Sequence, residues 1–267
     1  MKNGLLKYVA ALALLLPSGA AAAQLPDEAG EKEARKIVSE YSLVLGRTDA
    51  LSTYLSPLNY SGFTPALRGT WSKGMPFDAL RWRMRFEAQI GGGRLLNSPG
   101  TALEYNVAAR FSWGMERQWC VADHLTFSAG GNVGFNAGAL WLTRNSNNPV
   151  SLPLWAGVAA TGSVSYDFSF GRLPVTLSER VEVPTLGAFF MPGYGESFYE
   201  IYVGNHSGLV HCGWWGNAPG VTSHLQLTLR FRQGALGVGY LLDCRRIDAN
   251  NLKTRTALNA LTISWIR

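Results

Sequence analysis

The chain has 267 residues, of which 47% are hydrophobic and 16% charged, and its net charge at pH 7 is +6. That charge is too small, and the basic residues too scattered, to predict binding to nucleic acid. The three cysteines, Cys120, Cys212 and Cys244, are an odd number, so an exported form keeps at least one thiol unpaired.

Residues 1–23 have the order of regions that a secretory signal peptide requires. Two lysines make the start basic, residues 8–16 form an apolar run, and small residues follow up to Ala23. The apolar run has roughly half of the ~20 residues that a transmembrane helix needs, so we do not expect it to be an anchor. No cysteine lies near the expected cleavage after Ala23, as a lipoprotein would require. We therefore expect an exported chain that begins at Gln24.

Residues 24–40 are polar, and we expect them to form a lead-in on the periplasmic side, either as a short helix or as a disordered segment. We assign this lead-in no function. Residues 41–267 contain no linker that would divide them, so they are predicted to form a single all-β domain.

Apolar and polar residues alternate along most of this domain, as they do in a pleated strand with two different faces. The alternation is complete in residues 80–90 and continues in 103–116, which we expect to pair with 80–90 as a hairpin. Further strands are predicted at 125–141, 158–170, 175–183, 197–204, 221–233, 235–245 and 255–267, with less regular candidates at 41–46, 58–72 and 208–214. The fold class is therefore an antiparallel up-and-down β-barrel of about 10 to 12 strands, and we favour twelve because such barrels usually have an even number.

Three features indicate that the apolar face points outward into a membrane. The clear strands contain no lysine, and several run longer than the roughly 9–11 residues that cross a bilayer at the usual tilt. Aromatic residues recur on the apolar faces, as an interfacial girdle requires. The predicted girdle comprises Trp82, Trp113, Trp141, Trp155, Trp265, Tyr105, Tyr166 and Tyr240. We therefore expect a transmembrane barrel of the outer membrane, in contact with its lipid and inserted by the barrel-assembly machinery.

The polar faces carry charged residues of both signs that we expect to share the lumen. This predicted network comprises Arg81, Arg83, Arg85, Glu87, Glu104, Arg110, Glu116, Arg180, Glu182, Arg230 and Arg232. Because unpaired charges in a confined space are costly, the network predicts a plugged barrel with a structural or binding role. The excess of arginine also leaves open a narrow pore for small solutes, with a preference for anions.

An enzyme is the less favoured interpretation. The weak catalytic candidates are His206, Ser207 and His211, and the adjacent His206 and Ser207 would face opposite ways on a strand. They leave a lipid-acting hydrolase as an alternative. A soluble exported ligand-binding barrel is a second alternative, with the apolar faces turned inward. The histidines and cysteines lack zinc-site spacing, so we expect no metal and no cofactor.

Four segments, 51–58, 143–149, 194–200 and 250–253, together resemble an uncharacterised family of exported Bacteroidota proteins, a domain of unknown function. The resemblance extends over about residues 40–267 and implies a Gram-negative cell envelope, but it supplies no ligand or reaction. The final strand departs from a common outer-membrane pattern, because Arg267 follows the aromatic residue Trp265 near the C-terminus.

Overall fold

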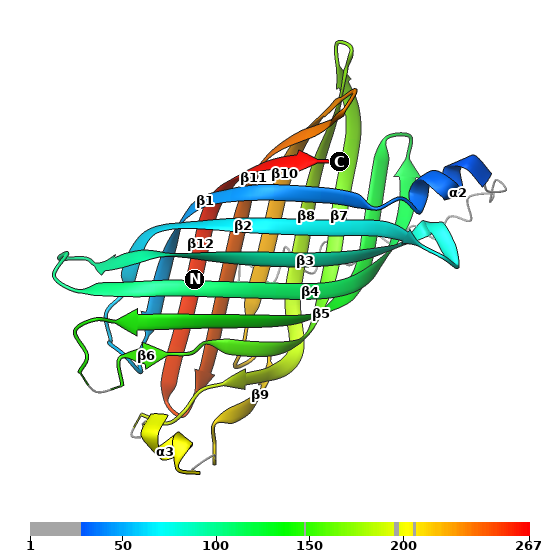
Figure 1. The fold of residues 1–267 in the computed structure, drawn as a ribbon. Coiled ribbons are helices and arrows are strands. Elements are labelled where there is room, and N and C mark those ends of the chain that lie inside the picture. The colour runs from blue at the N-terminus through cyan, green and yellow to red at the C-terminus, as the bar shows by residue number, and fades with distance from the viewer. Residues whose placement is uncertain (1–27, 147, 195–197, 205–206) are drawn as a thin grey trace.

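The computed structural model describes residues 28–146, 148–194, 198–204 and 207–267, and the expected signal peptide lies outside them. The short helix α2 (Glu28–Ala34) is followed by one antiparallel sheet that contains nearly all of the remaining chain (Figure 1). Its strands are β1 (Val38–Ser52), β2 (Tyr60–Met75), β3 (Asp78–Asn97), β4 (Leu103–Ala122), β5 (Leu125–Leu142), β6 (Val150–Ser151), β7 (Leu154–Phe170), β8 (Leu173–Phe190), β9 (Val210–Trp214), β10 (Gly220–Phe231), β11 (Gly234–Ala249) and β12 (Leu252–Ile266). No helix in the described part of the chain is both long and apolar enough to cross a bilayer.

The sheet closes on itself. Each long strand pairs with its neighbour in the chain, β12 pairs with β1, and β10 pairs with β8. The short strands β6 and β9 only extend β5 and β8 at one end. Ten strands therefore form the wall, which lies within the expected range, whereas the favoured count of twelve is wrong for the barrel itself.

The strand predicted at 197–204 is also wrong. The helix α3 (Phe198–Tyr202) occupies that segment, within the long connection between β8 and β10. Its aromatic and branched residues favour a strand, but the edge of β8 next to this connection is already paired with β9.

The strands alternate between a buried polar face and an exposed apolar face. On β12, Thr262 and Ser264 are buried, whereas Leu261, Ile263 and Trp265 are exposed. This arrangement is the reverse of a soluble barrel, and it forms an apolar outer band of the outer-membrane type. The polar residues face a lumen that side chains fill.

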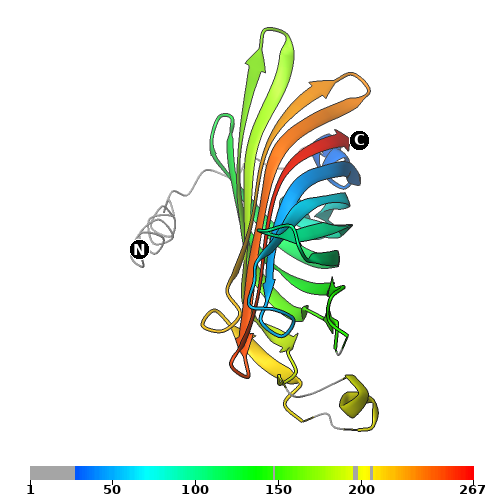
Figure 2. The same cartoon turned by 90° about the vertical axis from the view of Figure 1, so that its left-hand side faces the viewer.

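The two ends of the barrel differ in their connections (Figure 2). At the end where β1 begins, hairpins turn through only two residues, as between Met75 and Asp78 or between Phe170 and Leu173. The opposite end carries the longer connections, including β6, α3 and β9, although Asn250 and Asn251 make one tight turn there. We call these the short-turn end and the long-loop end.

The exposed aromatic residues include the predicted girdle members Tyr105 and Trp141, whose ring centroids lie 5.6 Å apart. Trp155 is a correction, because its side chain faces the lumen and packs near Phe189. Trp155 lies three positions before Val158, which faces outward. Because side chains alternate along a strand, residues an odd number of positions apart face opposite sides, so Trp155 faces inward. Phe189 also faces inward, because a bulge at Thr185 shifts the alternation of β8.

Candidate functional site in the barrel interior

Ion pairs between strands cross the middle of the lumen. Arg110 on β4 contacts Glu182 on β8, and its Nη1 lies 3.3 Å from Oδ2 of Asp243 on β11. None of these strands are neighbours in the wall, so their side chains meet across the interior. Thr222 Oγ1 accepts a hydrogen bond from Arg110, and Asn132 donates one to Glu182 at 2.6 Å. The guanidinium of Arg110 is therefore buried with its charge balanced.

A second group of contacts links β2, β3, β10 and β12. Arg68 on β2 forms a 2.7 Å ion pair with Glu87 on β3, and both side chains are less than a tenth exposed. Arg68 Nη1 also lies 3.1 Å from His224 Nδ1 on β10. Because a guanidinium only donates, Nδ1 accepts and the imidazole donates from Nε2 to Thr262 Oγ1 at 2.9 Å. The chain of contacts thus reaches from β2 across the lumen to β12.

Two further pairs complete what we call the ion-pair layer. Arg180 contacts Glu116, and Arg245 Nε lies 3.0 Å from Asp243 Oδ1. The layer comprises Arg68, Glu87, Arg110, Glu116, Arg180, Glu182, Asp243 and Arg245, with His224 beside them. Its four arginines are matched by four carboxylates, so the lumen at this level is occupied by paired charges.

The eleven charged residues predicted to share the lumen do not form one network. Glu87, Arg110, Glu116, Arg180 and Glu182 belong to the ion-pair layer, and Arg85 lies beside Glu87 at 3.8 Å. Arg83 is half-buried, whereas Arg81 and Arg232 are exposed near the short turns. Arg230 pairs with Asp167 at 3.4 Å on exposed side chains. Glu104 lies near the long-loop end, and its buried Oε1 has no hydrogen-bond partner among the described residues.

Four participants were not predicted as site residues: Arg68, His224, Asp243 and Arg245. Asp243 and Arg245 share the inward parity of their strand, which alternation alone could have indicated. Arg68 lies on the inward face of β2, in a segment with weak alternation. The contact between Arg68 and His224 joins residues 156 positions apart, and it has no signal in a single sequence.

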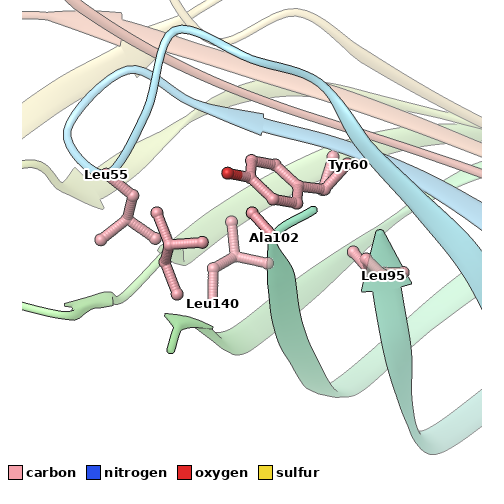
Figure 3. Close-up of a cluster of buried hydrophobic side chains, with 7 residues drawn as sticks. Leu55, Tyr60, Leu95, Ala102 and Leu140 are labelled. Atoms are coloured by element: carbon pink, nitrogen blue, oxygen red, sulfur yellow. The ribbon is translucent and has the colours of Figure 1, made fainter. Parts of the chain in front are cut away.

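Apolar side chains close the interior at the long-loop end. One cluster contains Ala50, Leu55, Tyr60, Leu95, Ala102, Leu140 and Leu142 (Figure 3). A second cluster contains Phe189, Met191, Ala218, Ile247 and Leu252. Leu55, Met191 and Ala218 come from connections rather than from the wall, so the loops fold over the barrel mouth. We call the two clusters together the apolar cap.

Between the cap and the ion-pair layer lies a chamber of about 150 Å³. Arg110, Asp243, Arg245 and Arg246 form its charged side, and Ala218 and Ile247 border it from the cap. The remaining lining is mostly apolar, with Trp155, Leu154 and Leu258 among it, but it also carries amide and hydroxyl side chains, which the apolar cap above it lacks apart from Tyr60.

The catalytic candidates form no comparable site. His206 lies outside the described residues, and Ser207 is exposed in a turn. His211 Nε2 lies 3.0 Å from the carbonyl oxygen of Met191, and its ring stacks on Phe189 at 5.4 Å. No hydrogen bond joins Ser207 to His211, and in the described segments no three acidic, histidine or cysteine residues gather as metal ligands. All three cysteines are free.

Similarity to solved structures extends along most of the chain at low identity. The transport unit of the autotransporter AIDA-I from Escherichia coli matches with a TM-score of 0.42 and 8% identity, over 90% of this chain and 93% of that chain. The outer membrane protease OmpT from Escherichia coli matches with a TM-score of 0.37 and 10% identity, over 86% and 95%. The translocator domain of the autotransporter NalP from Neisseria meningitidis has a TM-score of 0.37 and 7% identity, over 86% and 88%.

No curated protein matches this sequence. Residues 8–267 match the family described as "Protein of unknown function (DUF3316)", which includes the final strand that departs from the common outer-membrane pattern. The match covers nearly the whole chain, and the protein therefore belongs to the DUF3316 family.

Proposed function

We propose that the protein is exported by its N-terminal signal, inserted by the barrel-assembly machinery into the outer membrane of a Gram-negative bacterium, and acts there as a closed barrel that binds rather than conducts. The origin in Bacteroidota that the resemblance implies stays a prediction. The outward apolar face and the closed antiparallel wall support residence in a membrane.

The ion-pair layer is the observation that carries the closed state. Arg110 joins β4 to β8 and β11, and Arg68 joins β2 to β3 and β10, so neither half of the cross-section is left to a continuous water column. The apolar cap covers the same lumen at the long-loop end. The arginine excess would favour an anion pore, but acidic partners within the layer balance its arginines, which also supports the closed barrel.

The purified full-length barrel in a planar bilayer is expected to show no conductance above background. Buried ion pairs and the apolar cap both exclude the hydrated ions that would carry current. An open porin recorded under the same conditions is the positive control. Reproducible stepwise currents from the folded protein would contradict the closed barrel and restore the small-solute pore.

Native cysteines test the expected orientation. Short turns face the periplasm in barrels of this type, so Cys120, near the turn after β4, lies on the periplasmic side, and Cys212 on β9 lies on the outside. Both are exposed and free. In intact cells, a membrane-impermeant maleimide is expected to label Cys212 and to spare Cys120. The variant Cys212→Ser should lose the label, which assigns the label to Cys212. Preferential labelling of Cys120 would reverse the proposed orientation.

The lipid-acting hydrolase has no comparable support. The imidazole of His211 is engaged by Met191 and Asn250, both at the base of the loops. These contacts hold the connections at the long-loop end in place.

A further inference from the structure

The chamber presents side-chain amides that no protein group satisfies. Gln89 on β3, Asn106 on β4 and Asn136 on β5 all line it, and none of the three amides has a hydrogen-bond partner in the described part of the chain. Each amide offers two donors and one acceptor oxygen. Three neighbouring strands therefore direct unused donors and acceptors into one partly open chamber, where they require water or a ligand.

Trp155 gives the chamber a flat apolar side. Its indole lies across the inward faces of Gly157 and Gly187, where an added Cβ would come within 2.6 Å and 2.9 Å of ring atom Cζ2. Only residues without a side chain leave room for the ring to lie against the wall. One ring face is thus held by the backbone, and Trp155 also lines the chamber. An indole fixed in this way is a stacking surface for the C–H face of a saturated ring.

The charges beside the chamber are already paired. Arg245 lies 3.0 Å from Asp243, and Arg110 is bound by both Asp243 and Glu182. The fourth charged lining residue, Arg246, contacts Asp248. An ionic ligand would have to displace one of these partners and leave it unpaired, which is unfavourable in a confined space. The chamber therefore selects an uncharged ligand that forms many hydrogen bonds.

Size and access narrow the class further. A cavity of about 150 Å³ in another protein holds one benzene ring, so the chamber holds at most one six-membered ring, and the substituents of a hydroxyl-rich ring extend into its open side. A smaller cavity shares Pro153, Ile247 and Thr254 with it and continues toward Tyr54 and Met191. This cavity holds only about one water molecule, so a ring that enters from the long-loop end requires the apolar cap to open, whereas the ion-pair layer closes the opposite direction.

We infer that the chamber is a binding site for a small, uncharged, hydroxyl-rich ring, of the class of a neutral monosaccharide, that enters from the long-loop end. The amides of Gln89, Asn106 and Asn136 bind its hydroxyls, and Trp155 stacks against its apolar face. This inference rests on the proposed closed barrel and adds the chemical class of its ligand.

Isothermal titration of the folded full-length barrel in detergent tests the inference, with D-glucose and D-galactose as probes. Saturable binding of at least one sugar is expected, and Gln89→Leu and Asn106→Leu should each weaken it at least tenfold. Gln118→Leu is the matched control, because Gln118 faces the lumen on β4 but does not line the chamber. Its affinity should equal that of the unaltered protein.

Two further probes separate the outcomes. Equal or tighter binding of cyclohexanol would overturn the inference in favour of an apolar site, and preference for D-glucuronate would overturn it in favour of a charged one. Lack of binding by either sugar at 50 mM, in protein that is heat-modifiable and non-conducting, would reject the ligand while leaving the closed barrel standing. Conductance of the same preparation would instead reject the proposed function.

Discussion

Replacing Glu182 with leucine is expected to lower the free energy of unfolding by about 3–5 kcal/mol. The change removes one of the two carboxylates that contact Arg110 and leaves the buried layer with one positive charge uncompensated. Glu182 on β8 accepts hydrogen bonds from Arg110 on β4 and from Asn132 on β5, so a single substitution breaks contacts with two neighbouring strands that reach β8 through the lumen. Reversible denaturant unfolding in phospholipid vesicles, followed by the gel shift between boiled and unboiled protein, measures the loss.

The control is the double variant Arg110→Met/Glu182→Leu. It removes both charges and keeps Asp243 paired with Arg245 at 3.0 Å. Apolar replacement of a whole buried pair is often neutral or stabilising, so the double variant is expected to be more stable than Glu182→Leu alone. If the single variant lost less than about 1 kcal/mol, the value typical of an exposed pair, the layer would be hydrated and the lumen more open than proposed.

Period-two alternation predicts the barrel wall well for a physical reason. Each strand separates two media, so its two faces differ along most of its length, as in β3 and β4. The same signal fails where a strand lacks two distinct environments. The segment of α3 lies in a connection beyond the wall, and the bulge at Thr185 reverses the parity of β8, so neither follows from alternation.

The interior is predicted less completely than the wall. Alternation identifies residues that face the lumen, such as Arg110 and Glu182, but it does not say which of them meet. Those contacts depend on how the strands are staggered when the sheet closes. The stagger between β8 and β10 is hard to predict, because a long connection with α3 and β9 separates these two paired strands in the chain. The unused amides of the chamber carry even less signal, because glutamine and asparagine are ordinary residues of any polar face.

Replacing Val133 with arginine is expected to lower the free energy of unfolding in a lipid bilayer by about 2–4 kcal/mol, the range for an arginine at the midplane of such a barrel. Val133 lies near the middle of β5, is 51% exposed, and is flanked by the outward-facing Trp113 and Val158. In a soluble protein the same exposed position would accept arginine with little effect. The size of the loss therefore reports the medium that surrounds the barrel.

Val210→Arg is the matched control, since Val210 is a 68% exposed valine on β9 at the long-loop end. An arginine there reaches the interface, where the expected loss is about 0–1 kcal/mol. Denaturant unfolding of both variants in the same vesicles gives the difference. Equal, small losses at the two positions would mean that water contacts the apolar band, and the membrane assignment would fail even though the barrel stayed closed. A large loss confined to Val133 would place the bilayer at the level of the ion-pair layer, where the charges inside the wall are screened from lipid by the strands themselves.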